Sequence, residues 1–364
     1  MLIPSTYAIT FLLTILSMIC WGSWANTFKL TGKWRFELFY YDYAFGVLLA
    51  AVVAAITFGA MGEGFTFQDN LLVAGKRQIA YALGAGIVFN LANMLLVAAI
   101  SIAGLAVAFP VGIGLALVVG VAWNYFLNPQ GNPVLIGLGV LLIAVAIIFD
   151  ARAYTAHART SKTRAAAVIA PEPVIKSSSS KRRPTPPRPV RARQTGAKGI
   201  VISLISGLLM GSFYPLVEIS MQGDILGLGP YTVAFVFSIG VFVSTLVYNL
   251  YFMNLPVEGE PIAIWAYFQG TFKQHMLGVA GGIVWSIGAI ANFVASSAPK
   301  SVHVGPAISY AIGQGATIVS ALWGLLVWRE FAGAEPKVLR LLGLMLVFFV
   351  GGLALLSLAP LFAQ

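Results

Sequence analysis

Long, almost uncharged apolar runs dominate this 364-residue sequence and constrain its fold more than any motif does. A helix needs about 20 mostly apolar residues to cross the hydrocarbon core of a bilayer. The runs are continuously apolar rather than alternating, which favours helices over barrel strands. We therefore expect an all-α integral membrane protein with ten transmembrane helices, at roughly 4–25, 42–61, 79–101, 104–127, 133–151, 199–220, 229–253, 276–297, 303–328 and 338–360.

The composition excludes a soluble class of protein. Charged residues make up 9% of the chain, whereas soluble domains carry roughly 25%. The single cysteine, Cys20, cannot form an internal disulfide. His157, His275 and His303 are isolated, and no HExxH or CxxC spacing exists. The sequence therefore predicts no catalytic set, no metal site and no cofactor, and we do not expect an enzyme.

The positive charge is concentrated in one segment. Residues 151–198 hold twelve of the 22 Lys and Arg residues and one acid, Glu172, so they carry +11 of the net +10 and the rest sums to −1. This distribution argues against a nucleic-acid-binding face. Serine and proline are frequent here, which predicts a disordered, basic linker that touches anionic lipid. A specific regulatory or partner-binding role is the alternative.

The Lys and Arg residues also predict orientation, because they accumulate on the cytoplasmic side of membrane proteins. If segment 151–198 is cytoplasmic, 19 of the 22 lie inside, and Lys76, Arg77 and Lys300 lie outside. The short loops alone agree, with 7 inside against 3 outside. We expect a protein of the plasma (inner) membrane with both termini outside.

The two halves of the chain align with each other. Similar segments begin at Gly22 and Gly211 (GSWANTFKL, GSFYPLVEI), at Gly84 and Ala280 (GAGIVFN, AGGIVWS), at 111 and 312 (VGIG, IGQG), and around Gly139 and Gly343. Five spans per half is an odd number, so the second half is inverted across the membrane. Such inverted repeats are typical of secondary transporters, which hold their solute near the midplane between the repeats. The predicted domains are 1–150 for the first repeat, 151–198 for the linker and 199–364 for the second repeat.

Ten spans in two inverted halves with a long middle loop resemble the drug/metabolite transporter (DMT) superfamily. Within it, the chain is similar to the ureide permeases and the neighbouring glucose/ribose-type sugar uptake proteins. The matching stretches are GSWANTF, YDYAFGVLLAAVVAAITFG (41–59), NYFLNPQGNPVLIGLGVLLIAVAI (124–147), GIVISLISGLLMGSFYP (199–215) and ALWGLLVWREF (321–331). The resemblance implies uptake of ureides, nucleobase-like heterocycles or sugars. Plant ureide permeases carry a phosphate-loop-like motif in the middle loop, and this linker lacks one.

Polar side chains inside spans are costly unless they are paired, so they are the first candidates for a solute site. Amides that donate and accept, beside flat aromatic rings, suit a small neutral polar solute with several hydrogen-bonding edges. Interhelical hydrogen bonding and core packing are the competing interpretation of each residue. The candidates are Trp21, Trp24, Asn90, Asn93, Tyr214, Trp285, Asn292, Tyr310, Gln314 and Thr317, with Gln314 and Asn93 foremost.

Three acids lie within a turn or two of the predicted span ends, namely Asp42, Asp150 and Glu218. A solvated carboxylate is the default expectation for each. Asp42 and Glu218 are also candidates for a coupling or gate residue, since protons or another ion can drive such transport.

The leading hypothesis is a secondary transporter that imports the solute by alternating access. An exporter of hydrophobic cations favours a deep acid, and the span centres contain none. A non-transporting scaffold or an intramembrane enzyme is the third alternative. Substrate, coupling ion, direction and oligomeric state are not determined by these residues.

Overall fold

The computed structural model describes residues 1–62, 65–127, 132–169, 195–222, 226–257, 259–299, 301–302, 313 and 315–362. These residues form helices and connecting turns, with no strand among them. Nine of the described helices are long and apolar enough to cross a membrane. The tenth expected span, 303–328, lies partly outside the described ranges, and its described part is the shorter apolar run Ala316–Val327.

The helices follow one another with short connections. They are α1 (Tyr7–Ser23), α2 (Ala25–Leu30), α3 (Phe36–Ile56), α4 (Phe67–Val73), α5 (Lys76–Ala103), α6 (Leu105–Leu127), α7 (Pro133–Ile169), α8 (Thr195–Met221), α9 (Pro230–Asn254), α10 (Phe272–Ser296), α12 (Ala316–Leu322) and α13 (Pro336–Leu358). Short 3₁₀ helices, η1 (Ile264–Gln269) and η3 (Ala359–Phe362), and a π-helix, η2 (Trp323–Val327), complete the set.

Local chemistry fixes several helix ends. Proline is the first residue of α7, α9 and α13, where its missing N–H costs nothing. Thr66 and Asp69 form a reciprocal capping box at the start of α4. Gly104 adopts φ +88°, which breaks the chain between α5 and α6.

Helix reaches further into the predicted linker than expected. α7 continues to Ile169 and α8 begins at Thr195, so both ends of segment 151–198 are helical. Alanine, the best helix former, is frequent in 151–169 and outweighs the basic charges there. Residues 170–194 lie outside the described residues.

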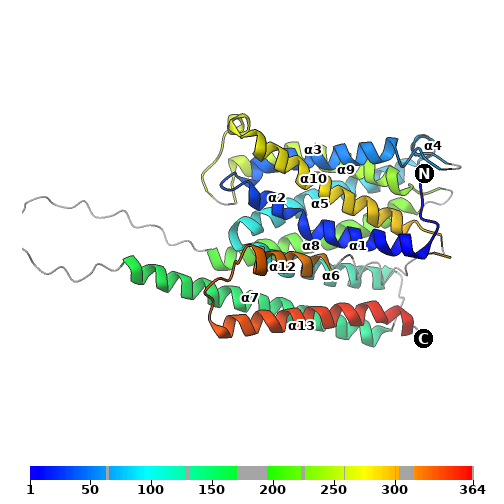
Figure 1. The fold of residues 1–364 in the computed structure, drawn as a ribbon. Coiled ribbons are helices and arrows are strands. Elements are labelled where there is room, and N and C mark those ends of the chain that lie inside the picture. Colours follow the sequence, from blue (N-terminus) through cyan, green and yellow to red (C-terminus); the bar gives the residue numbers. More distant parts are fainter. Residues whose placement is uncertain are drawn as a thin grey trace, which may run out of the picture.

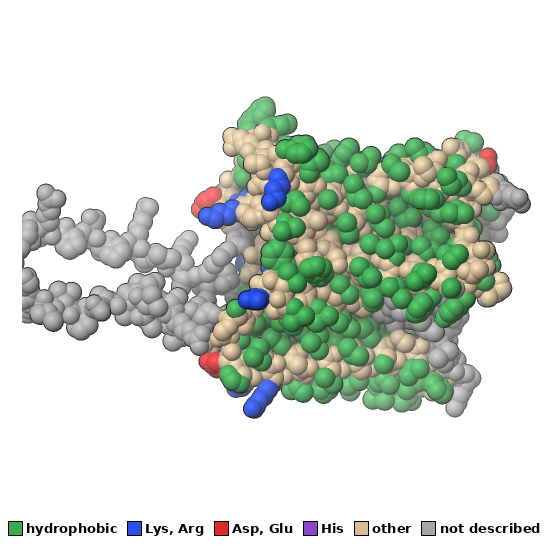
Figure 2. Space-filling view, in the orientation of Figure 1, with side chains coloured by type: hydrophobic (Ala, Val, Ile, Leu, Met, Phe, Trp, Pro, Cys, Tyr) green, Lys and Arg blue, Asp and Glu red, His purple; other side chains and the backbone are tan. Residues whose placement is uncertain are grey.

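The long helices lie side by side in one bundle, with both termini at one end and the end of α7 at the other (Figure 1). α5 and α6 pack against α8, α10 packs against α1 and α3, and α9 packs against α3 and α5. One buried cluster fills this part, and a second lies among α6, α7 and α13. Figure 2 shows apolar side chains covering the long face of the bundle, with the visible Lys and Arg side chains gathered near the end where α7 leaves it.

Glycines allow the closest helix contacts. A Cβ atom added to Gly22 of α1 would lie 2.5 Å from Cβ of Val319 on α12. A Cβ atom added to Gly211 of α8 would lie 2.7 Å from Cβ of Val119 on α6. Both glycines therefore serve close backbone approach, which is the common use of small residues between membrane helices.

Candidate functional site

An aromatic cluster occupies the interior of the bundle. The indole rings of Trp21 on α1 and Trp285 on α10 stack with centroids 6.2 Å apart. The ring of Phe89 on α5 lies 4.2 Å from that of Trp285, and Phe237 on α9 lies 5.8 Å from it. Phe213 on α8 contacts Phe89 at 5.2 Å. Five helices, drawn from both halves of the chain, therefore contribute to one apolar, flat-walled cluster.

A polar edge adjoins this aromatic cluster. The hydroxyl of Tyr214 on α8 donates to Oδ1 of Asn292 on α10 at 3.0 Å. A Cβ atom added to Gly313 would lie 3.7 Å from the Trp21 ring and 3.8 Å from the Asn292 amide nitrogen. Gly288 of α10 faces the Trp21 indole at 2.8 Å on the same measure. Trp21, Asn292 and Tyr214 therefore meet at one place, as their pattern in the sequence predicted.

Several buried polar atoms at this place have no hydrogen-bond partner among the described residues. They are Nε1 of Trp21, Oγ1 of Thr317, and Oγ of Ser17 and Ser320. Ser17 and Trp21 are one turn apart on α1, and Thr317 and Ser320 are one turn apart on α12, which packs against α1. A buried donor or acceptor left unpaired costs about 1–3 kcal/mol, so such a group calls for an explanation. A bound solute with complementary edges supplies one.

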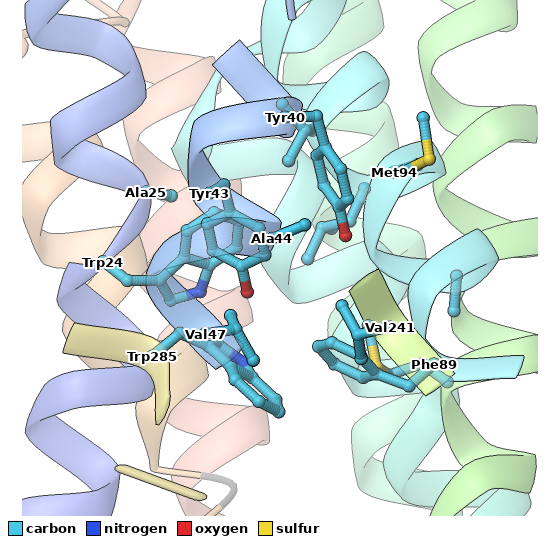
Figure 3. Close-up of a cluster of buried hydrophobic side chains, with 14 of the residues drawn as sticks. Trp24, Ala25, Tyr40, Tyr43, Ala44, Val47, Phe89, Met94, Val241 and Trp285 are labelled. Atoms are coloured by element: carbon cyan, nitrogen blue, oxygen red, sulfur yellow. The ribbon is translucent and has the colours of Figure 1, made fainter. Parts of the chain in front are cut away.

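A second polar group lies beside the aromatic cluster. The amide nitrogen of Asn93 donates to the hydroxyls of Tyr40 and Tyr43, each at 3.1 Å. The Tyr43 ring packs against Trp24 at 4.9 Å. Figure 3 shows Tyr40, Tyr43, Phe89 and Trp285 converging between the helices. Sequence reasoning found Asn93 and Trp24 but missed both tyrosines, whose signal was a pair of phenols three residues apart inside an apolar run.

Asn90 has a different environment from Asn93. Its amide nitrogen donates to Oγ of Ser244 at 2.8 Å and to Oγ1 of Thr245 at 3.1 Å, both on α9. These bonds hold α5 to α9, which is the packing role that competed with solute binding for every amide. Two further candidates, Tyr310 and Gln314, lie outside the described residues.

The family comparison agrees with this architecture of apolar helices around a polar interior. The family model described as ureide permease matches residues 39–184 and 188–359. The chain belongs to the ureide permease family. Its relatives are named as permeases, so the prediction of a membrane transporter rather than an enzyme is confirmed.

Individual relatives align over most of this permease. Ureide permease 1 and ureide permease 2 of Arabidopsis thaliana are each 26% identical, over 94% and 95% of this chain and 94% of each relative. Probable ureide permease A3 of Vigna unguiculata is 24% identical over 82% of this chain and 88% of its own length. A solved structure titled "Crystal structure of protein" shares the fold, with a TM-score of 0.50 over 96% of both chains at 15% identity.

The acids of this permease are less solvated than the sequence predicted. Asp42 and Asp150 are buried, and only Glu218, three residues before the end of α8, is half-buried. The Oδ1 atom of Asp42 accepts from the Tyr267 hydroxyl at 2.5 Å, and Oδ2 pairs with Nδ1 of His275 at 2.8 Å. The expectation of solvated carboxylates was wrong for Asp42 and Asp150, because neighbouring helices and η1 cover them.

A network of bonds closes the end of the bundle where α2 ends. Lys29 forms an ion pair with Glu330, and Glu330 also accepts from the backbone N–H groups of Leu105 and Ala106, at 2.9 and 2.8 Å, at the start of α6. The Trp328 indole N–H donates to Oδ1 of Asn26 at 2.6 Å. Each bond joins the first half of the chain to the second. Sequence reasoning counted Glu330 only as a loop residue and missed this role.

Proposed function

We propose that this permease imports a neutral ureide or nucleobase-like solute through a midplane site formed by Trp21, Tyr214, Trp285, Asn292 and Thr317. The observation that carries the proposal is the pair of unpartnered polar atoms, Nε1 of Trp21 and Oγ1 of Thr317, at a cluster of aromatic rings. A ureide presents N–H and C=O groups on its edges and a flat face. The edges pair with the amide, hydroxyl and indole groups, and the face packs on the rings.

The relatives support the class of solute, since those aligned above are named ureide permeases. Asn93 and Trp24 belong to an adjoining wall of the site through Tyr40 and Tyr43. Tyr310 and Gln314 remain proposed members on sequence grounds. Asn90 serves to hold α5 against α9 instead.

We also propose the DMT-type arrangement, with residues 1–150 and 199–364 as inverted repeats of five helices each around the 151–198 linker. The contact of Gly22 with Val319 and that of Gly211 with Val119 join repeat-related helices in the same way. The contacts around the interior glycines follow the same rule: Gly86 meets the Phe237 carbonyl and Gly282 meets the Tyr43 carbonyl, so α5 and α9 are related to α10 and α3. This symmetry supports transport by alternating access, in which the halves rock about the central site.

The proposed orientation places the termini outside the plasma membrane and the 151–198 linker in the cytoplasm, against anionic lipid. Lys29, Lys33 and Arg35 lie at the end of the bundle where α7 ends, and Lys76 and Arg77 begin α5 at the opposite end. On this orientation the Lys29–Glu330 network and Asp42 with His275 form a closed cytoplasmic gate. Glu218 lies toward the outer end, where we place it as an outer gate or coupling residue.

Calorimetric titration of the purified permease with allantoin, a ureide, tests the site. Wild-type protein is expected to bind it, and T317V, which keeps the shape of the side chain but removes the hydroxyl, is expected to bind it about 5–10-fold more weakly. S212A, which removes a hydroxyl bonded to its own helix at Leu208, is the matched control with unchanged affinity. Equal affinity of T317V and wild type would remove Thr317 from the site.

A further inference from the structure

Asp150 is a buried acid that the proposed solute site does not use. It lies on α7 with 0% of its surface exposed, on the face that also carries Ile143, Ala146 and Ala153. That face packs into the cluster among α6, α7 and α13. Neither of its carboxyl oxygens has a hydrogen-bond partner in the described part of the chain.

The surroundings of Asp150 do not offer a free cation. α6 contains no acidic or basic residue between 105 and 127, and Lys337 and Arg340 on α13 are exposed. Glu330 interacts with Asp150 electrostatically and repels a second negative charge. The ammonium of Lys29 is paired with Glu330. The other titratable groups near this end of α7 are Arg152, Tyr154, His157 and Arg159 on the same helix, with the hydroxyl of Tyr154 donating to the Ile102 carbonyl and His157 packing on Phe331, and Lys198 on α8, which donates to the Val257 carbonyl.

An unpaired carboxylate in such surroundings costs several kcal/mol, and a buried acid avoids this cost by binding a proton. A protonated carboxyl needs an acceptor for its O–H. Pro110 lies inside α6 and cannot donate to the carbonyl of Ala106, so this buried carbonyl lacks its usual helical donor. A metal cation would need several oxygen ligands, whereas the described residues contain no group of three or more His, Cys, Asp or Glu side chains that could hold a metal ion.

We propose that Asp150 is the proton-binding residue that couples transport to a proton gradient, an inference that rests on the proposed transport function. In the conformation described here Asp150 carries a proton, and Lys29 balances Glu330 alone. Loss of that proton to the cytoplasm leaves two carboxylates for one ammonium. Their repulsion weakens the bonds of Glu330 to Lys29 and to the start of α6, and so opens the cytoplasmic end. Rebinding of a proton restores the closed network.

Infrared spectroscopy of the purified full-length permease tests the protonation without any solute. The wild type is expected to show, at neutral pH, a carbonyl band of a protonated carboxylic acid that is absent from D150N. Asparagine mimics the neutral acid, so this variant is expected to fold. D150E serves if it does not, and its band is expected to shift. A band that is the same in wild type and in the folded variant would overturn the proposal.

Proteoliposome uptake of allantoin tests the coupling. An inward gradient of one pH unit is a tenfold ratio of proton activity, so one-proton coupling predicts up to about tenfold accumulation by the wild type. D150N is expected to lose this accumulation and to retain exchange of labelled for unlabelled solute, whereas D69N, which changes an exposed acid in α4, keeps both. Gradient-driven accumulation by D150N would overturn the coupling role. Absence of any uptake by the wild type would instead contradict the proposed function, and the infrared result would still decide the protonation of Asp150.

Discussion

Trp21 of α1 and Trp285 of α10 stack their indole rings with centroids 6.2 Å apart and planes inclined by 21°. Because α1 belongs to the first half of the chain and α10 to the second, the pair spans the boundary at which the proposed repeats move. Only one of the two indoles, Trp21, is recorded with a buried N–H that lacks a partner among the described residues. The pair thus combines a flat apolar surface with one unused donor.

Substitution of Trp21 by phenylalanine removes this donor and keeps a stacking ring. We expect W21F to bind allantoin about tenfold more weakly, since one net hydrogen bond is worth about 1 kcal/mol or slightly more. Its melting temperature is expected to be little changed, because the N–H makes no bond within the described protein. Calorimetry and thermal unfolding measure the two effects. W265F, at a Trp with 71% exposure in η1, is the control, and a W21F affinity equal to that of W265F would contradict the role.

The bond between Tyr214 and Asn292 joins α8 to α10 at the polar edge of the site. We expect Y214F and N292L each to weaken allantoin binding, and a double-mutant cycle to give a coupling of about 0.5–1.5 kcal/mol. N292D keeps an oxygen acceptor for the Tyr214 hydroxyl and is expected to preserve stability better than N292L. Strictly additive effects would show that the two side chains act independently.

Close helix contacts at the two repeat-related glycines predict matched stability losses. A Cβ atom at Gly22 or Gly211 meets both a valine side chain and a backbone carbonyl, of Ala316 and Ala116, at 2.6 and 2.8 Å. We therefore expect G22A and G211A each to destabilise the protein by about 1–3 kcal/mol. G343A is the control, since nothing lies within 4 Å of its added Cβ. A loss in G343A as large as in G22A would refute the packing explanation.

The number of apolar helices and several residues of the site were predictable because they depend on local composition and helical spacing. Burial of particular polar groups was not. Asn90 and Asn93 are three residues apart in the same apolar run, yet Asn90 meets two hydroxyls on α9 while Asn93 meets two phenols on α3. Asp150 likewise reads as a helix-end residue, and only the packing of α6 and α13 buries it. Such partners come from distant parts of the chain.

Tyr267, in η1 outside the spans, provides a pH test of the Asp42 cluster. Burial raises the pKa of the Tyr267 phenol above its ordinary value of about 10, and the hydrogen bond to Asp42 and the negative charge of Asp42 raise it further. We expect D42N to lower this pKa without restoring the ordinary value, because burial persists. Absorbance titration of each protein against its Y267F counterpart measures the shift.

The sign of the linked stability effect follows from the raised pKa. The neutral phenol is favoured in the folded protein, so its contribution to stability is complete below about pH 10 and is lost as the pH rises toward the folded-state pKa. The melting temperature of the wild type is therefore expected to fall more steeply above pH 10 than that of Y267F. Identical profiles would mean that Tyr267 titrates as a solvated phenol.

Uptake of labelled allantoin by proteoliposomes that contain the full-length permease tests the central claim most directly. The account predicts saturable uptake well above that of protein-free liposomes, competition by unlabelled uracil, and no competition by glucose. Its loss in the W21F/T317V double variant, with normal folding, would tie the transport to the aromatic cluster and its unpartnered polar atoms. Uptake no greater than in protein-free liposomes, or uptake of glucose in preference to allantoin, would contradict it.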